Sequence, residues 1–236
     1  MTAQLKVAVG DSWHPRLLPY FAVVMVALML ITNVLNLKFV DVMGISVIGS
    51  QIVYIFSLIL ADIMAEVYGY RRVRRVLYVS LGCLILYAVS VQIVVELPPA
   101  QDFAKDSEFR AVFAQSPRIA FASILAYFVT ELVNSFVMSK LKVRTRARFF
   151  YARATAAVGL AQIVNAVTFF SVAFGGVMSL WTIFSAGAVS WVIVMLCEIV
   201  VLPATKQIAT RVKHYEGIEH FDSAPPQRPG DQDVNG

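Results

Sequence analysis

Six long runs of apolar residues divide the chain, and short polar segments separate them. A helix needs about 20 mostly apolar residues to cross the roughly 30 Å of hydrocarbon in a bilayer. Each run is close to that length, so the pattern predicts six transmembrane helices. The predicted spans are Leu17–Leu37, Ser46–Val67, Val76–Leu97, Ile119–Ser139, Ala152–Phe174 and Ser179–Leu202.

The composition agrees with a membrane protein that crosses the bilayer several times. Apolar residues make up 58% of the 236 residues, charged residues make up 15%, and the mean hydropathy is +0.71. A soluble domain is typically about 45–50% apolar and about 25% charged. We therefore expect an all-α bundle of six helices in the inner (plasma) membrane of a bacterial cell, with the lipid bilayer as its main partner.

Basic residues are concentrated in alternate connecting segments, and this distribution sets the expected orientation. Cytoplasmic loops of membrane proteins are enriched in lysine and arginine. Six helices then place both termini in the cytoplasm, and the net charge of +5 reflects orientation rather than direct contact with nucleic acid. We expect a cytoplasmic N-terminal segment over 1–16, a transmembrane domain over 17–202, and a cytoplasmic, largely disordered tail over 203–236. The bases are Arg71, Arg72, Arg74, Arg75, Lys140, Lys142, Arg144, Arg146, Arg148, Arg153, Lys206, Arg211 and Lys213.

The sequence lacks the common motifs of metal binding and hydrolytic catalysis. Cys83 and Cys197 stand alone inside apolar runs, and the three histidines lie in the polar ends. No HExxH, nucleophile elbow or clustered acidic metal motif occurs. We expect no metal, no cofactor and no enzymatic activity.

A few polar residues interrupt the apolar runs. An ionisable side chain at the bilayer centre costs about 2.5–3.5 kcal/mol on insertion scales, so such residues usually face a cavity or the bundle interior. Tyr127, Glu131 and Asn134 recur at i, i+4 and i+7 and share one face of a helix. The other polar residues are Asn33, Asn36, Gln51, Asp62, Glu66, Gln162, Asn165 and Glu198.

The fifth predicted span carries a matching stripe. Gln162, Asn165 and Phe169 stand at i, i+3 and i+7, and "QIVN" resembles the "ELVN" of the fourth span. At about 1.5 Å per residue, both polar pairs lie toward the middle of the bilayer, where they could face one another across a cavity. The alternative is structural, because Asn and Gln often hold neighbouring membrane helices together.

Two carboxylates, Asp62 and Glu66, stand four residues apart near the end of the second span. One interpretation is a proton or gate site. The other is structural, with the acids paired to basic residues that hold the helix ends together. The following Tyr68–Gly69 predicts a helix end with glycine in a left-handed conformation. The candidate basic partners are Arg71, Arg75 and Lys140.

Four segments, in order, carry a resemblance to a known family. They read "TNVLNLKFV", "LADIMAEVYGYRRVRRV", "RIAFASILAYFVTELVNSFVMSKLK" and "RATAAVGLAQIVNAVTFFSVAFGG". Over roughly Thr32–Gly176 the chain resembles the queuosine precursor transporters, also described as vitamin uptake transporters. That family has six helices and is similar to the substrate-binding subunits of energy-coupling-factor vitamin transporters. The resemblance implies uptake of 7-cyano-7-deazaguanine or 7-aminomethyl-7-deazaguanine, the precursors of the tRNA base queuosine.

The chain departs from the family pattern at its most polar positions. The family usually reads Gln-x-x-Asp in both the fourth and the fifth helix, whereas this chain has Glu131-x-x-Asn134 and Gln162-x-x-Asn165. One carboxylate has moved by a turn and the other is missing, so either the ligand differs or the charge is redistributed. Positions that match the family are Asn33, Lys38, Asp62, Glu66, Tyr68, Gly69, Ser123, Tyr127, Phe169 and Phe170.

The resemblance implies roles for these residues. A carboxylate can accept two hydrogen bonds from the donor edge of a deazaguanine, and amides can meet a mixed edge. Our hypothesis gives Glu131 the donor edge, and it gives Asn134, Gln162 and Asn165 the remaining polar atoms. Aromatic side chains stack on the base. The stacking candidates are Tyr127, Phe169 and Phe170, and Asn33 completes the predicted substrate-binding residues. The predicted coupling or gating residues are Asp62, Glu66 and Lys38.

Other functions stay open at this stage. The chain could be a substrate-binding subunit for another vitamin or nucleobase-like compound, which needs a separate energising module. A lipid-modifying membrane enzyme and a non-catalytic assembly protein are further alternatives. The chain could also form a homo-oligomer. If it is a transporter, we expect its substrate to be a small molecule.

Overall fold

The computed structural model describes residues 15–42, 45–144 and 150–217. Within them the chain is almost entirely helical, in agreement with the predicted all-α membrane class, and a short hairpin joins the first two helices. The helices are α1 (Leu18–Leu35), α2 (Gln51–Tyr68), α3 (Tyr70–Glu96), α4 (Asp106–Phe113), α5 (Ser116–Arg144), α6 (Phe150–Phe174) and α7 (Leu180–Tyr215); the strands are β1 (Phe39–Val42) and β2 (Ile45–Ile48).

Several of these helices have the length and composition of membrane spans. Large apolar side chains such as Leu132 (70% exposed) and Val200 (73% exposed) cover their outer surfaces, as lipid contact requires. Across the described ranges, five stretches are long and apolar enough to cross a bilayer, and 158–174 is a shorter apolar helix. The five are Leu18–Leu35, Gln51–Tyr68, Arg71–Glu96, Asp106–Val133 and Leu180–Val201.

The predicted start of the second span at Ser46 is wrong, because Ser46 belongs to a β-hairpin and α2 begins at Gln51. Phe39 pairs with Ile48 and Val42 pairs with Ile45 in antiparallel register. The segment is rich in β-branched residues, which favour strands. Gly49 closes the hairpin, since a Cβ there would lie 2.9 Å from the Lys38 carbonyl oxygen that its own N–H contacts at 2.8 Å.

The ends of two helices also differ from the sequence-based boundaries. α3 begins at Tyr70, so Arg71–Arg75 lie on its first turns, and α7 continues through Pro203 to Tyr215. The predicted end of the last span at Leu202 therefore lies inside a helix. Gly69 separates α2 from α3 with φ +79° and ψ 154°. Its positive φ agrees with the predicted glycine stop, although its ψ is extended.

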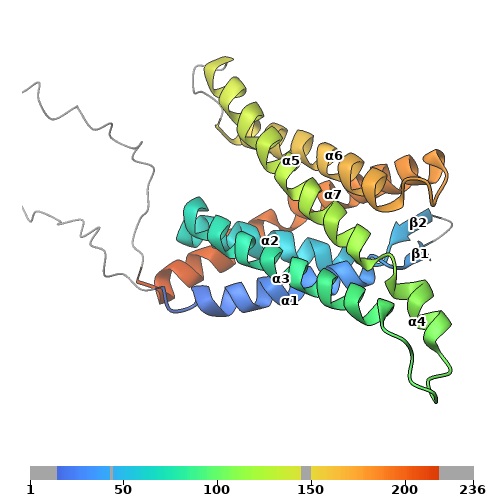
Figure 1. Ribbon diagram of the computed structural model, residues 1–236. Coiled ribbons are helices and arrows are strands. Elements are labelled where there is room, and N and C mark those ends of the chain that lie inside the picture. Colours follow the sequence, from blue (N-terminus) through green and yellow to red (C-terminus); the bar gives the residue numbers. More distant parts are fainter. Residues whose placement is uncertain (1–14, 43–44, 145–149, 218–236) are drawn as a thin grey trace, which may run out of the picture.

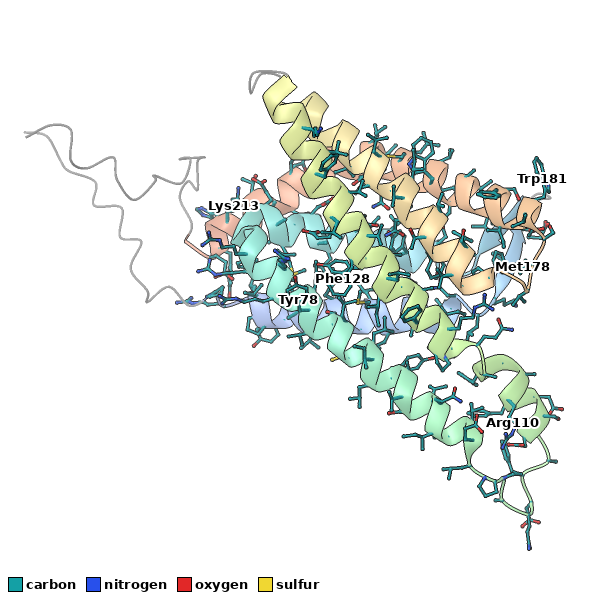
Figure 2. The ribbon with its side chains drawn as sticks, turned by 45° about the horizontal axis from the view of Figure 1, so that its top comes forward. Tyr78, Arg110, Phe128, Met178, Trp181 and Lys213 are labelled. Atoms are coloured by element: carbon teal, nitrogen blue, oxygen red, sulfur yellow. The ribbon has the colours of Figure 1, made fainter. Side chains whose placement is uncertain are left out.

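The helices form two groups (Figure 1). α1, α2, α3 and the last part of α7 lie together, while α5 and α6 run side by side and diverge from that group toward the end where α2 meets α3. The β-hairpin lies at the opposite end, beside the turn between α6 and α7, and α4 lies at the same end, below the hairpin in this view. Trp181 and Lys213 mark the two ends of α7 in Figure 2.

Two separate apolar clusters lie near the two ends of the bundle. The first joins α1, α2 and α3 to the extension of α7 and includes Met64 (0% exposed) and Ala209 (1% exposed). The second joins β2, α5, α6 and the start of α7 and includes Ile119 and Ala173, both fully buried. Burial of Ala209 explains why α7 continues beyond Pro203, because its extension packs against the first cluster.

Glu216 ties three elements together just beyond the last turn of α7. Its carboxylate accepts hydrogen bonds from the backbone N–H of Arg16 (3.0 Å) and of Leu17 (2.7 Å), which precede α1, and from the hydroxyl of Tyr68 (2.9 Å) at the end of α2. Burial alone would raise the pKa of the Glu216 carboxyl, but these donors and the Arg16 charge together lower it. A carboxylate at a helix N-terminus also compensates the helix dipole.

Arg118 joins two helices at the opposite end of the bundle. From the first turn of α5 it donates to the carbonyl oxygens of Val172 (2.8 Å) and Gly175, where α6 ends. These carbonyls have no partner within their own helix, so the guanidinium satisfies them. A Cβ on Gly175 would lie 2.3 Å from the Ser171 carbonyl oxygen, so only glycine fits this turn.

We predict that Glu216→Ala lowers the free energy of unfolding by about 1–2 kcal/mol at neutral pH, because a buried cap is lost. A lowered pKa in the folded state gives stability that is present above the unfolded pKa of about 4.3 and is lost as the pH falls through the folded pKa. The difference from wild type, measured by thermal unfolding in detergent, should therefore shrink in acid. Glu96→Ala, on an exposed helix end, is the control, and an equal loss there would contradict the assignment.

We predict that Gly175→Ala costs about 1–3 kcal/mol of unfolding free energy, because the backbone must move to admit the methyl group. Gly82→Ala is the matched control, since no described atom lies within 4 Å of a Cβ at that position in α3. It should leave stability unchanged or raise it by up to about 1 kcal/mol. Equal melting temperatures for the two variants would show that the turn is not constrained as described.

Candidate functional site

A cavity of about 290 Å³ lies inside the bundle, between the two apolar clusters. Its walls come from α1, α2, α3, α5, α6 and α7, together with Ile48 of β2. Ligand pockets in proteins typically measure about 300–1,000 Å³, so this cavity suits a small ligand. Met25 of the first cluster and Ile48 and Phe170 of the second contribute to its walls, so both clusters limit it.

The cavity brings together most of the binding residues that the sequence predicted. They come from α1, α5 and α6, so the described members of the polar stripes of α5 and α6 face a common space. Asn134 lies on α5, but its side chain falls outside the described part of the structure. The predicted residues that line the cavity are Asn33, Tyr127, Glu131, Gln162, Asn165, Phe169 and Phe170.

The amide of Asn33 has a defined orientation. Ser123 Oγ donates its hydrogen to the Ile119 carbonyl oxygen (3.0 Å), so it can only accept from Asn33. Asn33 Nδ2 donates to Ser123 Oγ at 3.1 Å. The carbonyl oxygen of the same amide is buried and has no partner among the described residues. Asn33 therefore offers the cavity a hydrogen-bond acceptor.

Two other polar pairs have a structural role. Ser190 of α7 donates to Gln51 Oε1 of α2 (2.5 Å), and Gln51 Nε2 donates back to the Ser190 carbonyl oxygen (3.5 Å). Ser50 donates to Asn36 Oδ1, which joins the start of α2 to the end of α1. These groups satisfy one another, as polar groups that hold membrane helices together do.

Gln162 is held by a residue that the sequence interpretation missed. The Tyr54 hydroxyl on α2 donates to Gln162 Oε1 on α6 at 3.3 Å. This bond directs the amide oxygen toward α2 and leaves the amide nitrogen of Gln162 as a donor. Tyr54 stands three residues after Gln51 on the same helix face, and this spacing could have identified it.

Four buried polar atoms on the cavity walls lack a hydrogen-bond partner within the described residues. Two belong to α1 and two to α5: Thr32 Oγ1, Asn33 Oδ1, Tyr127 OH and Thr130 Oγ1. An unsatisfied buried polar group costs about 1–3 kcal/mol, so such a concentration needs an explanation. A ligand that bonds to these atoms would supply one. Thr32 and Thr130 directly precede Asn33 and Glu131 and were not predicted.

Glu131 adds a charge to the same wall. Glu131 takes part in neither of the ion pairs Asp106–Arg110 and Glu66–Lys213. Its side chain lies half-buried on α5, one residue after Thr130. The wall of α5 therefore presents a carboxylate beside two unpaired hydroxyl groups.

The aromatic residues divide into two sets. Phe170 is 3% exposed and packs edge-on against Phe169 at 5.4 Å between ring centroids, where the second cluster borders the cavity. Tyr127 packs edge-on against Phe128, whose ring stacks on Tyr78 of α3 at 6.4 Å, a contact visible in Figure 2. Trp191 of α7 also lines the cavity and donates to the Gly159 carbonyl oxygen at 3.2 Å.

The predicted coupling residues lie outside the cavity lining. Asp62 is exposed on α2, Lys38 is exposed just before β1, and Glu66 pairs with Lys213 of α7 at 2.5 Å. The Glu66 partner is thus none of the three bases that the sequence suggested. Their arrangement fits the structural interpretation of Glu66, which ties α2 to the extension of α7, and the coupling role stays a prediction.

Comparisons with known proteins identify relatives that are described as transporters. A family described as "Putative vitamin uptake transporter" matches residues 49–208. A "Probable queuosine precursor transporter" from Bacillus subtilis (strain 168) is 22% identical over 146 residues, which cover 61% of this chain. The match spans 64% of that relative's length, slightly less than two thirds. No solved structure matches the chain.

We predict that Thr130→Val and Thr32→Val leave the free energy of unfolding of the ligand-free protein unchanged or slightly higher. Each hydroxyl has no bond to lose, and a methyl group of the same shape needs none. Ser50→Ala is the contrasting variant, because it breaks the bond to Asn36 and should cost about 1 kcal/mol. Thermal unfolding in detergent makes the comparison, and a loss in the two threonine variants as large as in Ser50→Ala would show that the hydroxyls are satisfied.

Proposed function

Because the chain belongs to the vitamin uptake transporter family, as its motifs indicated, we propose that it imports a small heterocycle of the deazaguanine class. The proposed substrates are the queuosine precursors 7-cyano-7-deazaguanine and 7-aminomethyl-7-deazaguanine. The proposed activity moves the substrate across the membrane without chemical change. The observation that carries this proposal is the row of unpaired polar atoms on the cavity wall, next to the Glu131 carboxylate.

The chemistry of the wall favours a ligand rich in hydrogen-bond donors. Asn33 Oδ1 and the Glu131 carboxylate can only accept, whereas Tyr127 and the two threonines can accept or donate. A deazaguanine presents a ring N–H and an amino group on one edge and a carbonyl oxygen beside them. In the proposal, the acceptors of the wall take hydrogen bonds from the donor groups of the base, and the amide nitrogen of Gln162 donates to its carbonyl oxygen.

Aromatic side chains supply the other half of base recognition. Stacking on an aromatic ring is worth about 1–3 kcal/mol per base in nucleic-acid binding proteins. Tyr127, Trp191 and Phe169 line the cavity, and Phe169 also packs against the second cluster. Since Phe170 is nearly fully buried in the second cluster, we assign stacking to the other three residues and packing to Phe170.

The proposal includes an orientation in the bacterial inner membrane. Six spans, with α6 completing the set, would place the α2–α3 turn and the end of α7 in the cytoplasm, as the positive-inside rule requires. Arg71, Arg74 and Arg75 are exposed on the first turns of α3, where headgroup phosphates could meet them. The β-hairpin and α4 would then lie on the periplasmic side.

We predict that a deazaguanine raises the melting temperature of the purified protein in detergent. A ligand at 100 times its dissociation constant stabilises the folded state by about 2.7 kcal/mol. The panel should contain both deazaguanines, guanine and water-soluble vitamins. Glu131→Ala should abolish the deazaguanine shift and uptake, whereas Glu96→Ala, far from the cavity on the end of α3, should retain both.

The outcomes separate the possible functions. A shift with another vitamin but with neither deazaguanine would assign a different ligand to the same cavity. Binding without accumulation in vesicles that hold only this protein would show that a separate energising module is needed. Well-folded protein that responds to no compound in the panel would overturn the proposed function.

A further inference from the structure

The lining of the cavity carries a negative charge without a positive charge to balance it. Among the described residues that line it, Glu131 carries the formal charge and the others are neutral. A carboxylate in such a place is normally paired, because an uncompensated charge in a low-dielectric interior is costly. Glu131 has no ion-pair partner among the described residues.

Three basic side chains on α3, α5 and α7 have partners away from the cavity. Arg74, on the face of α3 toward Tyr127, donates to the Tyr78 hydroxyl at 2.7 Å, and its guanidinium lies 5.4 Å from the centre of that ring. Lys140 of α5 lies over Phe136 at 5.3 Å, and Lys213 of α7 pairs with Glu66. None of these three is a cavity-lining residue. The described walls therefore hold no cation that neutralises the carboxylate.

We infer that Glu131 is a specificity-determining residue that makes this cavity prefer a cationic base to a neutral base of the same shape. The inference rests on the proposed function and refines it. The aminomethyl base carries a primary amine, which is protonated at neutral pH as a lysine side chain is. The cyano base is neutral at the same position. The two compounds share their ring system, so contacts to the ring largely cancel when their affinities are compared.

The positions of the two acceptors agree with such a ligand. Asn33 bonds to Ser123, which precedes Glu131 on α5 by eight residues, or about 12 Å along the helix axis. The Cα–Cβ bond of a helical residue tilts toward the N-terminus of its helix, which is the direction from Glu131 to Ser123. The wall thus offers two acceptors that are separated along α5. The aminomethyl base has donors at both ends, with its amino and N–H groups on one ring and the ammonium group on the other.

The experiment measures the dissociation constants of 7-aminomethyl-7-deazaguanine and 7-cyano-7-deazaguanine for the purified full chain in detergent, at neutral pH and low salt. We expect wild type to bind the aminomethyl base at least tenfold more tightly than the cyano base. Glu131→Gln keeps the shape and removes the charge, so the ratio should fall to within about threefold of unity, mainly through weaker binding of the cation. Glu131→Asp keeps the charge and should retain the preference, and Glu96→Gln is the control away from the cavity.

Each outcome decides the matter. Equal affinities in wild type, a preference for the cyano base, or a ratio that Glu131→Gln leaves unchanged would overturn the inference and leave the proposed function standing. Failure of folded wild-type protein to bind either base would overturn both. If Glu131→Gln does not fold, the ratio in Glu131→Asp and its dependence on ionic strength decide, because a charge–charge preference weakens as salt is added and a preference based on shape does not.

Discussion

The structure depends on one constraint, which is that hydrocarbon cannot solvate a polar group. Every polar side chain in a span must therefore find a partner inside the bundle or face a space that another molecule can enter. Most of the polar side chains here have a partner inside the bundle, as Gln51 and Ser190 do between α2 and α7. Those on the facing walls of α1 and α5 do not, and the unpaired atoms of Asn33 and Thr130 lie beside the cavity. The same rule thus produces both the helix contacts and the site.

Stability and function are divided between different parts of the bundle. The apolar clusters near the two ends, with Met64 in one and Ile119 in the other, each contain fully buried side chains and limit the cavity between them. The cavity itself carries unpaired hydroxyl groups and a lone carboxylate, which disfavour the empty state. Since α5 and α6 diverge from the other helices at one end (Figure 1), the wall that carries Glu131 belongs to the helix pair with fewer neighbours there.

Sequence periodicity predicted the helical class, the approximate spans and the shared cavity of Glu131 and Gln162, because hydrophobic runs and i, i+4 spacing are local properties. It did not predict the β-hairpin, since an apolar β-branched segment such as Ile45–Ile48 reads equally well as the start of a membrane helix. The sequence did not predict Tyr54 and Thr130 as cavity residues, because Tyr and Thr are common in membrane spans. Only the packing of α2, α5 and α6 places them on the cavity wall. The Lys213 partner of Glu66 depends on how far α7 continues, which a proline at 203 argues against locally.

Glu216 joins the last described turn of the chain to the residues that open the first helix, and Arg16, Leu17 and Glu216 all lie outside the matched segment 49–208. During synthesis, the N-terminus of α1 enters the membrane long before residue 216 leaves the ribosome. Its first amide groups must therefore remain bound to water or to lipid headgroups while all the other helices insert. The contact can therefore form only after the chain has been made as far as Glu216 and α7 has taken its place in the bundle.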